Sequence, residues 1–165
     1  LVALGLGRIF RGSGMLMEDW PHDRSRQVDH VIGAFYFVRK SVFEALRGFD
    51  ERFFMYLEDL DFSLRANRLG WRSHYLADTC AFHLGGGTSR QVKDRRLFYS
   101  LRSRVQYSFK HFDRSAAAIV FMLTVILEPV VRTGWAAVRF SWGELIQTIG
   151  AYRLLYQWIF RVSQP

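Results

Sequence analysis

The sequence contains a single cysteine, Cys80, among its 165 residues. One thiol cannot form an internal disulfide, and it excludes a metal site built from several cysteines. We also find no internal repeat and no low-complexity tract. Half of the residues are hydrophobic, which argues against disorder over most of the chain. The composition therefore predicts a folded domain with a core of its own.

Long apolar runs and acidic residues are also scarce. The most apolar stretch, residues 116–127, has only Thr124 as a polar interruption and is followed by Glu128 and Pro129. Because a helix that spans a membrane needs about 20 apolar residues, this stretch predicts a buried, re-entrant or interfacial helix. Lysine and arginine together number 23 against 15 acidic residues, and this net charge of +8 favours phosphates, nucleic acid or acidic lipid as partners.

The first residues carry no recognisable targeting signal. The opening, LVALGLGRIFRGSG, is too short and too rich in glycine to be the apolar core of a signal peptide, and it lacks an initiator methionine. We expect the chain to be part of a longer protein with a further N-terminal portion.

Residues 28–90 predict an α/β arrangement. The run VDHVIGAFYFVRK is rich in β-branched and aromatic residues and predicts a buried strand interrupted by Gly33 and Ala34. The next segment, KSVFEALRGFD, predicts a short helix with Ser41 as N-cap, Glu44 as its capping-box partner and Gly48 as the stop signal.

A second helix is predicted from MYLEDLDFSLRANRLG, with Gly70 at its end. Its expected apolar face consists of Leu57, Leu60 and Leu64. The segment WRSHYLADTCAFHLGGGTS then predicts one or two short strands that lead into a glycine-rich loop.

Three carboxylates, Glu58, Asp59 and Asp61, lie at the start of the second helix. They are either the solvated first turn of a surface helix, which the helix dipole favours, or they include a group that performs chemistry. Asp59 and Asp61 match a D-x-D metal motif only formally, because residues two apart on a helix point about 200° away from each other. Asp61 has Arg65 four residues later as an ion-pair partner.

His83 is a second candidate, at the expected end of a strand and before LGGGTSR. It is either a structural histidine or a metal ligand. Thr88, Ser89 and Arg90 follow glycines that free the backbone, so this loop could bind a diphosphate or could simply be an exposed surface loop. Aromatic residues near the carboxylates, Phe53, Phe54, Tyr56 and Trp71, could line a sugar site or belong to the core.

From residue 93 onward the chain predicts helices only. VKDRRLFYSLRSRVQYSFKHF is a basic amphipathic helix, and the segment WGELIQTIGAYRLLYQWIFRV combines aromatic residues with a polar stripe of Arg153, Gln157 and Arg161. This combination is typical of a membrane interface, although ordinary packing on the first domain or on a second subunit would also use such helices. The predicted domains are 1–92 and 93–165.

The order of these segments closely resembles the C-terminal half of the catalytic domain of family 2 inverting glycosyltransferases, which have the GT-A fold. The resemblance rests on Gly33-Ala34, on GFDERFFMYLEDLDFSLRANRLGW and on HLGGGTS, and it covers residues 28–112 well and the helical tail loosely. Bacterial rhamnosyltransferases of cell-surface polysaccharide synthesis look most similar. The resemblance thus implies the C-terminal portion of a GT-A domain followed by an α-helical tail.

The resemblance also implies a role for each candidate residue. Asp59 matches the family's general base with Glu58 beside it, and His83 matches its histidine ligand for Mg²⁺ or Mn²⁺. Gly33, Ala34, Thr88, Ser89 and Arg90 would bind the diphosphate of the donor. Phe54, Tyr56 and Trp71 would contact the acceptor.

A complete enzyme of this kind would transfer a sugar, for example rhamnose, from a nucleotide-diphospho-sugar to a glycan or lipid-linked acceptor with inversion. We expect it at the cytoplasmic face of a bacterial membrane, bound to anionic lipid. The sequence leaves open whether the chain also forms a homo-oligomer. The family's donor-binding half should precede this chain, so the chain alone should be inactive. There are two rival interpretations: a non-catalytic, membrane-associated remnant of the fold, and a basic nucleic-acid-binding module. The chain has no recognisable RNA-binding motif, so we expect no nucleic acid as a partner.

Overall fold

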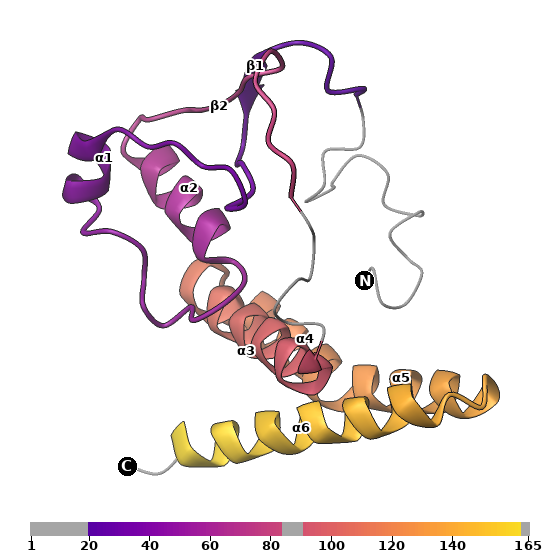
Figure 1. Cartoon of the computed structure of the whole chain (residues 1–165). Helices are drawn as coiled ribbons and strands as arrows, with labels where there is room; N and C mark the ends of the chain where they lie inside the picture. Colours follow the sequence, from indigo (N-terminus) through magenta and orange to yellow (C-terminus); the bar gives the residue numbers. More distant parts are fainter. Residues whose placement is uncertain (1–19, 84–90, 163–165) are drawn as a thin grey trace. The chain divides into compact units, whose positions relative to one another are not determined.

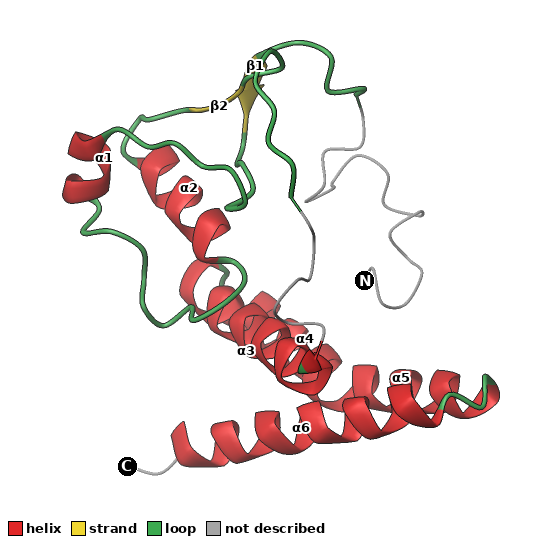
Figure 2. Ribbon diagram, in the orientation of Figure 1, coloured by secondary structure: helices red, strands yellow, loops and turns green. Residues whose placement is uncertain are grey.

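The computed structural model describes residues 20–83 and 91–162, which form two compact units. The first unit contains residues 20–51 and 57–83, and the second contains Arg52–Tyr56 and residues 91–162. Figure 1 labels the elements of both. Figure 2 shows that irregular segments make up much of the first unit, whereas the second is almost wholly helical.

The only strands in the described part of the chain form a small antiparallel sheet in the first unit. Strand β1 (Arg26–Val28) pairs with β2 (Ser73–Tyr75), so that Arg26 lies opposite Tyr75. The predicted buried strand over residues 28–40 is wrong, because the ladder ends at Val28 and residues 29–39 are irregular. A strand forms only where a partner satisfies its backbone groups, and β2 supplies partners for three residues only.

Helix α1 (Lys40–Ala45) forms where the sequence predicts it, but its start differs. Its N-cap is Arg39 in an extended conformation, and no side chain caps the helix. Ser41 therefore lies inside the helix, and Glu44 pairs with the exposed Lys40 one turn earlier instead of closing a capping box. The predicted stop at Gly48 is confirmed: this residue has a φ of +73° and donates its N–H to the carbonyl of Phe43.

Helix α2 (Glu58–Arg68) is also confirmed, and Gly70 follows it with a φ of +87°. Its buried face differs from the prediction, because the helix buries Asp61, Phe62, Ser63 and Ala66 rather than the three leucines. Phe62 and Ala66 pack with Val42 of α1 and with Tyr36 and Leu46. This small core holds the first turn of α2, where the candidate carboxylates lie.

The second unit consists of long helices. Helix α3 (Lys93–His111) confirms the predicted basic helix, and α6 (Trp142–Val162) matches the last predicted segment. These two helices pack through a core of Leu101, Tyr152 and Leu155. The segment Arg52–Tyr56 belongs to this unit, because the hydroxyl of Ser103 donates to the Met55 carbonyl at 2.7 Å.

The apolar stretch forms one continuous helical rod from Arg114 to Val138. It comprises α4 (Arg114–Met122), a π-helical turn η4 (Leu123–Leu127) and α5 (Glu128–Val138), and α5 packs along α6 (Figure 1). The apolar stretch that Glu128 and Pro129 follow is therefore part of a longer helix, which continues through both residues. Pro129 is tolerated because it lies at the start of α5, directly after the wide turn.

Pro129 leaves one carbonyl of this rod without its usual donor. A residue at this position would normally donate its N–H four residues back, to the carbonyl of Val125, and proline has no N–H. The hydroxyl of Tyr156, on α6, donates to that carbonyl at 2.8 Å. A side chain of a neighbouring helix thus replaces the backbone donor that Pro129 lacks.

We expect Tyr156→Phe to lower the free energy of unfolding by about 1 kcal/mol, because the Val125 carbonyl loses its donor. Denaturant unfolding followed by circular dichroism measures the change. The double variant Tyr156→Phe, Pro129→Ala restores a backbone donor and should lose less than the sum of the two single variants. If the losses of the two single variants simply add in the double variant, the Tyr156 hydroxyl does not replace the donor that Pro129 lacks.

Candidate functional site

The entry into α2 has an unusual backbone. Tyr56 and Leu57, directly before the helix, have φ values of 68° and 67°, in the left-handed region that side chains disfavour. Two consecutive residues of this kind cost of order 1–3 kcal/mol each. Backbone strain of this kind concentrates at functional sites, which draws attention to the two carboxylates that follow immediately.

Asp59 is held by two backbone N–H groups. Its Oδ2 accepts a hydrogen bond from the N–H of Gly33 at 2.8 Å, and its Oδ1 accepts one from the N–H of Leu60 at 2.8 Å. The side chain is half-buried. A Cβ built on Gly33 would lie 3.4 Å from Oδ2, an ordinary contact, so Gly33 matters here through its N–H. The carboxylate is therefore fixed in direction while part of it stays accessible.

Glu58 lies beside it in a different environment. Burial raises the pKa of the Glu58 carboxyl, and the negative charge of Asp59 raises it further. Its buried Oε2 has no hydrogen-bond partner among the described residues. The pair thus combines one carboxylate stabilised by donors with another whose protonated form is favoured.

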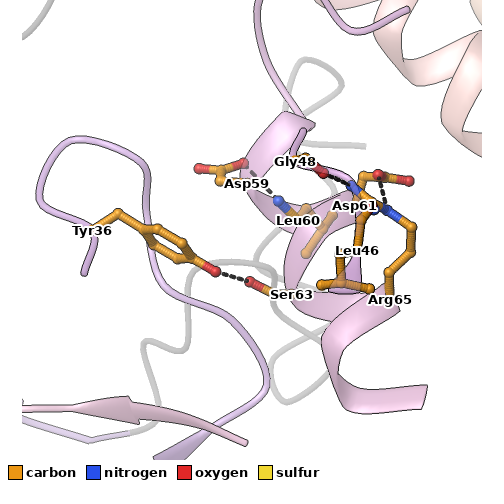
Figure 3. A network of polar contacts seen from close by, with 8 residues as sticks. All are labelled: Tyr36, Leu46, Gly48, Asp59, Leu60, Asp61, Ser63 and Arg65. Atoms are coloured by element: carbon orange, nitrogen blue, oxygen red, sulfur yellow. Dashed lines mark hydrogen bonds and ion pairs between the residues drawn. The ribbon is translucent and has the colours of Figure 1, made fainter. Parts of the chain in front are cut away.

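Asp61 takes no part in this pair. It is fully buried, and its Oδ2 accepts a hydrogen bond from Nε of Arg65 at 2.7 Å, as the sequence predicts (Figure 3). Figure 3 also shows Asp59 and Asp61 on different sides of the helix, which confirms that they do not form a D-x-D clamp.

Arg65 makes further contacts that the sequence did not indicate. Its Nη1 and Nη2 donate to the carbonyls of Leu46 and Gly48 at 2.8 and 2.9 Å, and so connect α2 to the segment after α1 (Figure 3). The hydroxyls of Tyr36 and Ser63 also meet, at 3.4 Å. These contacts hold in place the helix that carries the candidate carboxylates.

The other candidate residues of the first unit are more exposed. Ala34 lies with Gly33 in a turn, and Trp71 follows α2. His83 lies in an irregular segment after β2, not at the end of a strand as predicted, and its side chain is exposed. Thr88, Ser89 and Arg90 lie outside the described residues. Across residues 20–83 and 91–162, no three His, Cys, Asp or Glu side chains converge as a metal site would require.

Two predicted acceptor residues belong to the second unit. The exposed ring of Phe54 lies 4.8 Å from the ring of Tyr99, centroid to centroid. Tyr56 is half-buried. Phe53 next to them is buried and packs near Tyr107, so this aromatic residue belongs to the core.

Comparison with known proteins gives consistent matches. The family model described as glycosyl transferase family group 2 matches residues 22–162. The rhamnosyltransferase WbbL of Escherichia coli is 35% identical over 94 residues, which are 53% of this chain and 36% of that protein. No solved structure matches the chain.

Two further relatives are also named as sugar transferases. The N-acetylglucosaminyl-diphospho-decaprenol L-rhamnosyltransferase of Mycobacterium tuberculosis is 41% identical over 58 residues, 35% of this chain and 19% of that protein. A low-salt glycan biosynthesis hexosyltransferase of Haloferax volcanii is 28% identical over 146 residues, 87% of this chain and 46% of that protein. The chain thus spans less than half the length of each of these relatives.

Proposed function

Since the chain belongs to glycosyl transferase family group 2, we propose that it forms the acceptor side of an enzyme that transfers a sugar from a nucleotide-diphospho-sugar to a glycan or lipid-linked acceptor. Family membership implies a GT-A type fold. The finer assignment, to the C-terminal part of that fold, rests on the resemblance of residues 28–112 to the C-terminal half of the family's catalytic domain. The observation that carries the proposal is the half-buried Asp59, fixed by Gly33 at the strained start of α2.

The reaction is a single displacement with inversion. Asp59 takes the proton of the acceptor hydroxyl as that oxygen attacks the anomeric carbon, and the bond to the nucleoside diphosphate breaks. The N–H groups of Gly33 and Leu60 each hold one oxygen of the carboxylate, and each oxygen keeps a further lone pair that can accept the proton of the acceptor. Glu58 lies beside the base in a partly buried position that raises its own pKa.

The names of the relatives support rhamnose as the sugar and a lipid-linked acceptor, since two of them are rhamnosyltransferases and one acts on a diphospho-decaprenol lipid. We assign the diphosphate of the donor to Gly33, Ala34 and the loop with Thr88, Ser89 and Arg90, and the acceptor to Phe54, Tyr56 and Trp71. Transfer assayed with the whole gene product, followed by NMR of the product's anomeric centre, tests the proposal. Retention of configuration or absence of transfer from every nucleotide-sugar would contradict it.

A divalent cation, Mg²⁺ or Mn²⁺, is part of the proposal, but the described residues do not form its site alone. Such a cation takes about six ligands, and His83 offers a single nitrogen. We propose that His83 contributes one ligand to a site completed elsewhere in the protein, and we derive no step through the metal.

We expect His83→Ala to raise the concentration of Mg²⁺ or Mn²⁺ needed for half-maximal transfer by about tenfold or more, since even the residues that only orient a metal's ligands commonly contribute 10–100-fold to metal affinity. A metal titration of the transfer rate measures this. His74→Ala, which removes an exposed histidine from β2, is the matched control and should leave the titration unchanged. An identical metal dependence in both variants would make His83 structural.

We also propose that the second unit binds the cytoplasmic face of a membrane. The helix Arg114–Val138 is long and apolar enough to cross a membrane, and 17% of its most apolar window is buried. Its large exposed side chains include Ile119, Met122, Ile126, Val130, Trp135 and Val138. Helix α6 adds Trp142, Ile146 and Phe160. An apolar surface of this extent marks an interaction site, and lipid fits it because α3 adds basic residues.

In flotation experiments, we expect the chain to rise with anionic vesicles at low salt and to be partly released at high salt. The reason is that basic residues near an anionic surface contribute on the order of 1 kcal/mol each, and salt screens them. Vesicles of neutral lipid are the control. If the chain stays soluble with both lipids at low salt, and deletion of residues 115–165 unfolds it, the helices are ordinary core.

A further inference from the structure

The helical rod from Arg114 to Val138 keeps its charged residues on one side. Between its two ends only Glu128 and Arg132 are charged, and Nε and Nη2 of Arg132 donate to Oε1 of Glu128 at 2.8 and 2.7 Å. Glu128 is buried, and so are Thr124, four residues before it, and Ala136, eight residues after it. Residues at this spacing share one side of a helix, so the charged side of the rod is also its buried side.

Another side of the rod is apolar and exposed. Ile126 and Val130, near its middle, are 54% and 66% exposed. They belong to a row at spacings of three, four or eight residues, which we call the apolar face and which consists of Ile119, Met122, Ile126, Val130 and Val138. Exposed arginines, Arg114 and Arg139, lie at the two ends of the rod. An apolar face flanked by cations fits a lipid surface with anionic headgroups.

Helix α3 is attached to the middle of this rod. Arg104, on α3, pairs with Glu128 and is 34% exposed. Near the end of α3, the ring of Phe109 lies 6.1 Å from the ring of Phe121 on α4, centroid to centroid. The exposed basic residues of α3 include Lys93, Arg95 and Arg96. The depth of the rod in a lipid layer therefore also sets the depth of a strongly charged helix.

Helix α6 is attached to the same part of the rod. The hydroxyl of Tyr156 donates to the carbonyl of Val125 at 2.8 Å. One turn before Tyr156, Arg153 is exposed, and it lies in an exposed row between Ile149 and Phe160. Helix α6 thus brings an arginine to the level of the middle of the rod, within an otherwise apolar row.

We propose that the rod lies in the plane of the membrane, with its apolar face in the acyl chains of one leaflet, and does not cross the bilayer. Its length does not decide the matter, because 25 residues span about 37 Å and a bilayer core is about 30 Å thick. The attached helices decide it. If the rod crossed, its middle would lie at the centre of the bilayer, together with Arg104 and Arg153.

Charged side chains at the centre of a bilayer are strongly disfavoured. At the depth of the headgroups, Arg153 can instead extend its aliphatic stem towards water and keep its charge solvated. Arg104 and the exposed basic residues of α3 then stay on the water side of the rod, where they are attracted to anionic lipid. The inference rests on the membrane binding proposed above, and it does not depend on catalysis at Asp59.

The accessibility of the two ends of the rod tests the proposal. Cys80, which is exposed, is first changed by Cys80→Ser, and a single cysteine is then introduced by Ser115→Cys or Arg139→Cys. Sealed membrane vesicles carry the whole gene product with the cytoplasmic face outward, and a membrane-impermeant maleimide is added. We expect both ends to react equally before and after detergent opens the vesicles. An end that reacts only after detergent would show that the rod crosses the bilayer and overturn the proposal.

A charge on the apolar face provides the second test. Ile126→Glu should weaken binding of the whole chain to anionic vesicles by about tenfold or more, because an isoleucine no longer enters the acyl chains. Phe37→Glu, at an 88% exposed position of the first unit, is the matched control and should leave binding unchanged. Both positions are exposed, so circular dichroism should show an unchanged fold.

The outcomes separate this inference from the proposed function. Unchanged binding of the Ile126→Glu variant would overturn the assignment of the apolar face. A wild-type chain that binds no vesicles would overturn both the orientation and the membrane location. Sugar transfer is assayed separately, so its absence would contradict the proposed reaction and leave the orientation of the rod to the labelling experiment.

Discussion

Asp59→Asn should reduce kcat for sugar transfer by on the order of 10²–10⁴-fold, the usual contribution of a general base. Asparagine has the same shape, and its amide oxygen can still accept the hydrogen bond from Gly33 that fixes the side chain. It cannot take up a proton. The loss should therefore appear in the chemical step, while the affinity for the donor nucleotide stays close to that of the wild type.

Transfer rates and nucleotide-sugar binding, both measured with the whole gene product, check this result. Asp29→Asn, which changes an exposed acidic residue of the same unit, is the matched control and should retain full activity. Turnover of the Asp59 variant near the wild-type rate would remove Asp59 from the reaction. Loss of donor binding together with turnover would instead assign Asp59 to the donor or its metal.

Asp61→Asn should lower the free energy of unfolding by about 3 kcal/mol, the lower end of the range for a broken buried ion pair. Asp61 is fully buried, and Arg65 is 19% exposed, so the arginine charge would lose its partner with little water to replace it. From the sequence alone the cost would be well under about 1 kcal/mol if the pair were exposed. The observed burial changes that expectation.

The exposed pair of Lys40 and Glu44 provides the control for this experiment. It has the same spacing of four residues, but its side chains are 87% and 63% exposed. Glu44→Gln should therefore change the free energy of unfolding by less than about 0.5 kcal/mol. Denaturant unfolding of both variants measures the difference. Similar small losses of unfolding free energy in both variants would show that burial does not strengthen the ion pair of Asp61 and Arg65.

Features determined by local spacing were predictable from the sequence. The pair of Asp61 and Arg65 and the opposite directions of Asp59 and Asp61 follow from helix geometry. The bounds of α6 and the turn at Gly48 follow from apolar periodicity and from the conformational freedom of glycine. These features depend only on residues within one or two turns of each other.

Features determined by distant partners were not predictable. The run after Val28 has the composition of a strand, but strand formation depends on how many residues β2 can pair. The N–H of Gly33 meets Asp59 across 26 residues, and no sequence pattern marks that contact. The burial of Asp61 likewise depends on α1 and the segment after it, whose carbonyls bind Arg65. The continuation of the helix past Pro129 is different, because the sequence did allow it: proline is tolerated in the first turn of a helix.

The hydrogen bond between Tyr156 and Val125 has a consequence for the order of events during synthesis. The tyrosine lies 31 residues after the carbonyl that it satisfies. A ribosome releases the chain from its N-terminus, so Val125 is exposed before its partner has been made. In the interval only water can pair with this carbonyl, and hydrocarbon offers none. The hydrogen bond to Val125 can therefore form only after α6 has emerged, and under the membrane binding proposed above we expect the two helices to reach lipid as a preassembled pair.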